Sequence, residues 1–161
     1  MKKIFWLILP VIMIFCISGC SEKEEKNISI YDLQKAVLEA GKDFPEMKTV
    51  NGSSEDAASL FTYLSDVEYE KVDAFFLSYA AEGESYEVAV VRMKENSDVK
   101  EMTDSLKAHV DDRINLYKNY EPEQVGRAEE ADVFSEGKYA VLIMCDNKSD
   151  IKAAFENIIN E

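Results

Sequence analysis

The sequence predicts a single α+β domain in which an antiparallel four-stranded sheet is covered by helices on one face. Two pairs of strand-like runs are each joined by a turn that contains glycine: residues 72–80 with 86–94, and residues 132–135 with 138–145. Runs with helical spacing of apolar residues precede, separate and follow these hairpins. The expected order is therefore α-α-β-β-α-β-β-α, which is typical of a layered α+β fold.

Two helices are expected before the first hairpin. The first covers residues 30–40, because Ser29 can cap its start with Asp32 three residues on, and Gly41 can end it. Pro45 then favours a turn. The second, shorter helix covers residues 55–64 and follows an Asn-Gly-Ser-Ser break.

Two further helices are expected after the first hairpin. The longest covers residues 98–120, where apolar residues recur every three or four positions until Pro122 prevents continuation. Its apolar stripe consists of Val99, Met102, Leu106, Val110, Ile114, Tyr117 and Tyr120. The closing helix covers residues 150–159 and can be capped by Ser149.

Composition excludes several classes of function. The 161 residues include 18 Lys plus Arg against 32 Asp plus Glu, which gives a net charge of −14. A basic surface is needed to displace counterions from nucleic acid, so we expect no nucleic-acid partner. The single histidine argues against a multi-histidine metal site, and we expect neither a metal site nor a cofactor.

The first twenty residues, MKKIFWLILPVIMIFCISGC, have the pattern of a secretory signal. Two lysines precede an apolar run at residues 4–17, which is too short to span a bilayer comfortably. The following Ile-Ser-Gly-Cys sequence resembles the lipobox of bacterial lipoproteins. This resemblance implies cleavage between Gly19 and Cys20, and lipidation of the Cys20 thiol with diacylglycerol and palmitate-type chains. Two acyl chains suffice for stable anchoring.

These features divide the chain into three parts. Residues 1–19 form the signal peptide, residues 20–27 the lipidated cysteine with a charged tether, and residues 28–161 the folded domain. Cleavage removes two lysines and takes the net charge from −14 to −16. An anionic membrane should repel such a domain, so we expect it to stand off the outer face of the cytoplasmic membrane.

Several features recur together along the chain. They are the lipobox, the helix YDLQKAVLEAG, the Phe-Pro-Glu-Met turn, the VDAFFLSYA…YEVAVVRMK hairpin, the long acidic helix, the strand EGKYAVLIMCDN and the last helix. In these features, which cover essentially the whole mature domain, the chain resembles the DUF4358 family. The resemblance implies a family of lipoproteins, mostly from Gram-positive Firmicutes, whose function is uncharacterised. The resemblance implies the anchor and the fold, and it supplies no catalytic residues.

Candidate catalytic residues are few. Cys145 could act as a nucleophile with His109 as its base, but it alternates with Val141 and Ile143 on a strand and is expected to be a buried structural residue. The segment that begins at Asp146 lacks the glycine and the final glutamate of a calcium loop. No known catalytic motif is present, and the protein is not expected to be an enzyme.

Carboxylates cluster at residues 121–132 and in a pair on the preceding predicted helix, and they leave an alternative function open. These residues are Asp111, Asp112, Glu121, Glu123, Glu129, Glu130 and Asp132. Such clusters usually form a solvated face. Acids near residues 121–132 could nevertheless serve a cell-envelope hydrolase as general acid and base.

The expected function is therefore a lipid-anchored extracytoplasmic binding or accessory protein of the cell envelope. If helices cover only one face of the sheet, the other face is partly bare and can meet an envelope protein partner. The strand positions expected on that face are Ala74, Phe76 and Ser78. The oligomeric state is not determined by these patterns.

The anchor gives a direct prediction. Replacing Cys20→Ser should abolish labelling of the chain by radioactive or clickable fatty acid, because a hydroxyl does not accept the diacylglycerol group, and it should release the protein into the medium. A matched Cys16→Ser change should leave labelling intact, because residue 16 lies within the apolar run of the signal. Unchanged labelling of the Cys20 variant would contradict the lipobox assignment.

Overall fold

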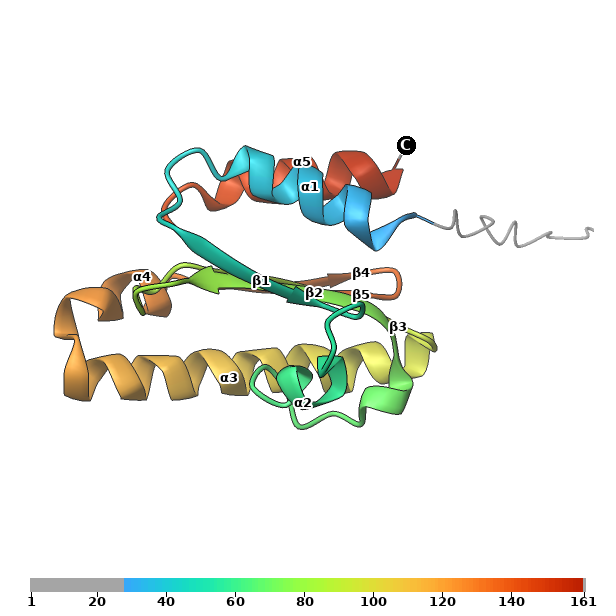
Figure 1. Cartoon of the computed structure of the whole chain (residues 1–161), viewed down its shortest axis with the longest axis horizontal. Helices are drawn as coiled ribbons and strands as arrows, with labels where there is room; N and C mark the ends of the chain where they lie inside the picture. Colours follow the sequence, from blue (N-terminus) through green and yellow to red (C-terminus); the bar gives the residue numbers. More distant parts are fainter. Residues whose placement is uncertain (1–27, 161) are drawn as a thin grey trace, which may run out of the picture.

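The computed structural model describes residues 28–160 of the chain. The predicted signal peptide, cleavage site, lipidated Cys20 and tether lie outside the described residues and stay predictions. The described part is a mixed α+β domain of three layers, with helices above and below a single sheet (Figure 1). No helix of this part is long and apolar enough to span a membrane.

The sheet is antiparallel throughout and has five strands in the order β1-β2-β3-β5-β4. Strands β2 and β3 form the first predicted hairpin, and β4 and β5 form the second. The bounds of the strands are Met47–Asn51 for β1, Val72–Ala80 for β2, Glu87–Met93 for β3, Asp132–Glu136 for β4 and Tyr139–Met144 for β5. The turn between β4 and β5 contains Gly137 at a φ of 53°, a conformation that suits glycine in a tight hairpin.

The prediction of four strands is wrong, because β1 adds a fifth at one edge of the sheet. This segment, MKTVN, is short and lies between a turn and a Gly-Ser break, and it contains a single β-branched apolar residue, Val50. It becomes a strand by pairing with β2, with Met47 opposite Ala80 and Asn51 opposite Phe76. Pairing over such a sequence distance leaves no local signal for a sequence analysis to detect.

Five α-helices accompany the sheet within residues 28–160. They are α1 at Ile30–Ala40, α2 at Ala57–Phe61, α3 at Val99–Tyr120, α4 at Val125–Glu129 and α5 at Lys148–Asn160. Short 3₁₀ turns cover Tyr69–Lys71, Asn96–Asp98 and Pro122–Gln124. The predicted cap of α1 is present, since the Ser29 side chain accepts a hydrogen bond from the Asp32 N–H and Gly41 is the C-cap.

The prediction that helices cover one face of the sheet is also wrong. Helices α1 and α5 cover one face, and α2, α3 and α4 lie on the other (Figure 1). The expected bare surface is consequently closed: Phe76 and Ser78 are fully buried beneath α1 and α5, and Ala74 is half-buried. These three residues therefore do not form a partner surface.

One apolar core lies on each face of the sheet, and both cores include side chains from its strands. The core beneath α1 and α5 includes Leu33, Phe76 and Phe155. The core above α3 includes Phe75, Leu106 and Leu142. Alternate residues of each central strand supply the two cores, because successive side chains of a strand point to opposite faces.

Gly41 allows a close approach that a side chain would prevent. A Cβ at this position would overlap the ring of Phe44, which returns against the end of α1. We predict that Gly41→Ala destabilises the fold by about 1–3 kcal/mol, as overpacking does elsewhere. Thermal unfolding followed by circular dichroism measures the change.

The matched control is Gly126→Ala in α4, where a Cβ meets nothing within 4 Å. Alanine costs less backbone entropy than glycine in a helix, so this change should leave stability unchanged or raise it by about 0.5–1 kcal/mol. Equal destabilisation by the two changes would contradict the close packing of Phe44 on Gly41.

Candidate functional site

A groove lies between α2 and α3 on the side of the sheet that they cover. It encloses about 710 Å³, and the strands β1, β2 and β3 form its floor. Its lining is mostly apolar and aromatic, with four residues that can carry charge: Val50, Leu60, Tyr63, Leu77, Tyr79 and Leu116, together with Glu87, His109, Asp112 and Arg113. This combination of apolar walls and a few convergent polar groups is typical of binding sites.

Glu87 is the buried polar group of this groove. Its side chain is 4% exposed, and its Oε1 lies 2.7 Å from Nε2 of His109. The other carboxylate oxygen, Oε2, lies 3.7 Å from Nε of Arg113, a distance that suits an ion pair and is too long for a hydrogen bond. A buried carboxylate needs such partners, because removal from water disfavours its charged form unless other groups replace the water.

The helical period of α3 positions the basic side chains. His109, Arg113 and Tyr117 are four residues apart, so they lie on one face of the helix. The Arg113 guanidinium donates to the Tyr117 hydroxyl and lies 4.8 Å from the centre of its ring. Burial raises the pKa of Tyr117, and the nearby Arg113 charge opposes this rise. Tyr117 is held from the other side through a hydrogen bond to the Gly83 carbonyl.

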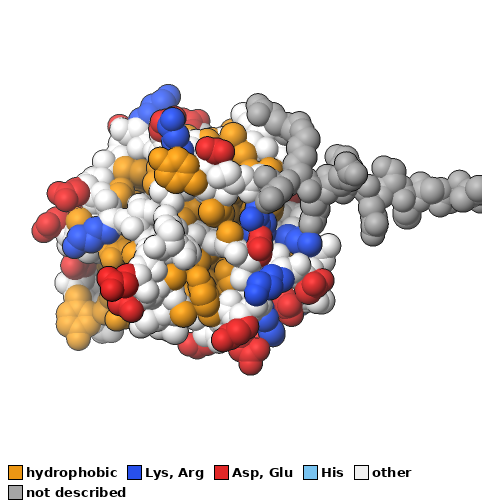
Figure 2. Space-filling view, turned by 45° about the vertical axis from the view of Figure 1, so that its right-hand side comes forward, with side chains coloured by type: hydrophobic (Ala, Val, Ile, Leu, Met, Phe, Trp, Pro, Cys, Tyr) orange, Lys and Arg blue, Asp and Glu red, His pale blue; other side chains and the backbone are white. Residues whose placement is uncertain are grey.

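The lips of the groove expose large apolar side chains. Tyr63 is 74% exposed and Leu116 is 44% exposed, although both line the groove. Figure 2 shows the wider pattern on one face of the molecule, with exposed apolar side chains between acidic and basic ones. Exposed apolar groups beside a groove are typical of an interaction site.

The groove contains no complete catalytic set. His109 is oriented by Glu87, as a general base would be, but the groove lining includes no serine, threonine or cysteine that it could activate. Within residues 28–160, no group of three His, Cys, Asp or Glu side chains could hold a metal ion. The arrangement can bind an apolar group and orient a polar one beside it.

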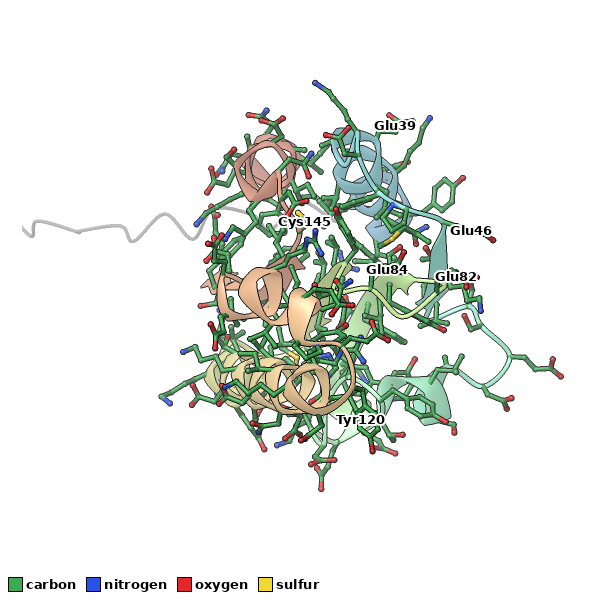
Figure 3. All side chains as sticks on the ribbon, turned by 90° about the vertical axis from the view of Figure 1, so that its left-hand side faces the viewer. Glu39, Glu46, Glu82, Glu84, Tyr120 and Cys145 are labelled. Carbon is green, nitrogen blue, oxygen red and sulfur yellow. The ribbon has the colours of Figure 1, made fainter. Side chains whose placement is uncertain are left out.

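Cys145 and His109 do not come together. Cys145 belongs to the core beneath α1 and α5, whereas His109 lines the groove on the opposite side of the sheet. Figure 3 shows Cys145 close to α5 and remote from α3. The thiol is 2% exposed, and burial raises its pKa to about 11. This thiol is therefore protonated at neutral pH and is a structural core residue.

The acidic residues near 121–132 are dispersed rather than convergent. Glu129 pairs with Lys118, Glu130 with Lys148, and Asp132 with Lys152, at 3.4–3.6 Å. Asp146 is held by Arg127 and by the Tyr86 hydroxyl, and the Arg127 hydrogen bond lowers the pKa of this carboxyl. None of these carboxylates is paired with another as acid and base.

Sequence reasoning missed Glu87, although a signal for it exists. Every second residue of β3 faces α3. These residues are Glu87, Ala89, Val91 and Met93, and the last three belong to the core on that side. A carboxylate in register with three core residues indicates a buried charge that needs a partner. The groove itself gave no signal, because its lining comes from five separate elements.

The three layers and the two cores define a small α+β domain with a groove on one side of its sheet. A family model described as "Domain of unknown function (DUF4358)" matches residues 47–145. The chain belongs to this family, and the predicted resemblance is confirmed. No curated protein and no solved structure matches the chain significantly.

The Glu87–His109 pair gives a prediction about stability. His109→Ala should destabilise the fold by about 1–3 kcal/mol, because it removes the short hydrogen bond of a buried carboxylate. His109→Gln should lower the free energy of unfolding by less, since the glutamine amide N–H can still donate to Glu87. Urea unfolding measures both values.

Lys107→Ala is the matched control on the same helix. Its ammonium pairs at 3.7 Å with Asp104, and both side chains are more than half exposed, so the loss should stay within about 0.5 kcal/mol. If His109→Ala lowers the free energy of unfolding no more than Lys107→Ala does, the buried Glu87 carboxylate does not depend on His109.

Proposed function

We propose that the protein is a lipid-anchored, extracytoplasmic binding domain of the bacterial cell envelope, and that its binding site is the groove between α2 and α3. One observation carries the proposal: the groove combines an apolar lining of about 710 Å³ with exposed Tyr63 and Leu116 at its lips. A partner that buries these side chains gains the hydrophobic free energy that the isolated domain leaves unused.

The anchor and the location rest on the amino-terminal sequence. The apolar run, the small residues and Cys20 agree with a lipoprotein signal, and the charge of the mature chain favours a position away from an anionic membrane. A tethered domain of this kind has its whole surface available to other envelope molecules. Binding or an accessory role in an envelope complex therefore fits the anchor.

The chemistry of the groove favours binding over catalysis. His109 lies at hydrogen-bond distance from Glu87 and Arg113 lies at ion-pair distance from it, so these polar groups are largely occupied by one another. Three of the carboxylates near residues 121–132 that a hydrolase could use, Glu129, Glu130 and Asp132, are separately paired with lysines. No specific geometric feature favours the hydrolase alternative.

Site-directed photocross-linking in intact cells tests this function. A photoreactive residue at Leu116, or at Tyr63, should form the same discrete adduct, because both positions line one groove. The matched control position is Asn157, which is exposed on α5 across the sheet. It should form no such adduct.

A second change links the adduct to the groove. Leu116→Asp, in the chain with the photoreactive residue at position 63, should lower the adduct yield about tenfold, because a charge at an apolar contact opposes burial. The melting temperature should be unchanged, since Leu116 is 44% exposed. Equal adducts from position 157, or none from either groove position, would contradict the proposal.

A further inference from the structure

Strand β1 presents an edge with free backbone groups. Glu46 and Gly52 flank β1 on either side. The Ala81 N–H donates to the Glu46 C=O, and the Gly52 N–H donates to the Phe75 C=O, so the backbone groups of Glu46 and Gly52 point toward β2. Backbone groups of an antiparallel strand alternate in direction along the chain. Lys48 and Val50 therefore also face β2, whereas Met47, Thr49 and Asn51 direct their N–H and C=O groups away from the sheet.

One of these three outward residues is already satisfied. The Asn51 N–H donates to Ser54 Oγ, and the Asn51 C=O accepts from the Ser54 N–H. For Met47 and Thr49, the hydrogen bonds among residues 28–160 provide no such cap for either outward group. The open edge thus consists of two N–H and two C=O groups at Met47 and Thr49.

The open edge lies directly beside the groove. Val50 of β1 and Leu60 of α2 both line the groove, so the groove reaches the underside of this edge strand. Figure 1 shows β1 at the exposed margin of the sheet, with α1 on one side of it and α2 on the other. A strand added there would lie about 4.8 Å from β1. Alternate side chains of that strand would then point toward the groove.

Charge selects the kind of segment that fits this edge. Exposed acids flank β1 on both sides in the chain, with Asp43 and Glu46 before it and Glu55 and Asp56 after it. Figure 3 shows Glu46 and Glu82 projecting at this margin of the molecule. Asp112 adds a carboxylate to the groove lining, and Lys48 is the one basic residue of β1. Lys42 is a second exposed basic residue of this margin, so the four flanking acids outnumber two lysines, and an approaching segment meets net negative charge.

We infer that β1 binds an extended, basic segment of a partner protein by strand addition, with an apolar side chain of that segment in the α2–α3 groove. This inference rests on the proposed function and specifies the chemistry of the partner. Main-chain hydrogen bonds to Met47 and Thr49 supply affinity, and the groove supplies selectivity for alternate side chains, as in other cases of strand addition. Lysine or arginine residues of the segment meet the flanking acids.

A second copy of the chain is a poorer occupant of the same edge. Each mature chain carries a net charge of −16, so two copies would bring like charges together at the acidic margin of β1. A basic segment experiences attraction at that margin. The charge of the domain therefore distinguishes the two kinds of partner.

Thr49→Pro tests strand addition with little disturbance to the fold. Proline removes the outward N–H of residue 49 and obstructs a neighbouring strand, but it spares the ladder with β2, because that N–H does not face β2. Thr49→Val is the matched control: it retains the N–H and, like proline, loses the hydroxyl contact with Ser78. Thermal unfolding of both variants establishes that they remain folded.

Randomised short peptides displayed on phage, panned on the full lipidated chain in detergent, provide the probe. We expect the selected peptides to alternate apolar and basic residues and to slow hydrogen exchange at the Met47 and Thr49 amides. Thr49→Pro should weaken their binding about tenfold or more, whereas Thr49→Val should bind like the unmodified chain. Raising the salt concentration should also weaken binding.

The other outcomes separate this inference from the proposed function. Peptides that bind Thr49→Pro normally but fail on Leu116→Asp would overturn strand addition and leave the groove as the site. Selection of no peptide, or of acidic ones, would overturn the inference, and the photocross-linking result would then decide the groove independently. A concentration-dependent dimer that Thr49→Pro abolishes would assign the edge to a second copy and would overturn the inference as well.

Discussion

The structure depends on a sheet whose central strands are buried on both faces. Every residue of β5 is buried, and so is every residue of β3 except the half-buried Arg92. A strand of this kind cannot leave one face in water, because each exposed Val, Leu or Ile side chain would forfeit about 1.5–3 kcal/mol of burial free energy. This constraint requires a helical layer on each face of the sheet: α1 and α5 cover one face, and α3 covers the other.

Double-sided burial also accounts for the charge chemistry of the groove. Glu87 lies on β3 and faces α3, so it leaves water together with its apolar neighbours. The facing stripe of α3 compensates the loss of water at this carboxyl group, because it places His109 at hydrogen-bond distance and Arg113 at ion-pair distance from it. The buried polar groups of the groove therefore contact one another, and the acidic side chains that exceed the basic ones lie on the exposed surface.

The groove and the open edge arise where the helical layer is incomplete. Helix α3 has 22 residues and packs on β4 and β5, whereas α2 has only five and reaches β1. Between them the floor of β1, β2 and β3 is only partly covered, and Tyr63 and Leu116 form the lips of the gap. A domain built around a fully covered sheet centre therefore has its groove and its open strand edge at the margin, where β1 ends the sheet.

The sequence by itself determined the parts whose signals are local. Helical spacing located α1, α3 and α5 to within a few residues, turn glycines located both hairpins, and alternation placed Cys145 in the core. Only the tertiary structure decided that β1 is a strand, that both faces are covered, and that Phe76 is buried rather than exposed. The physical reason is the same in each case: the partner that defines the feature lies far away in the chain. Met47 becomes part of a strand because Ala80 pairs with it, and Glu87 becomes part of a site because His109 faces it.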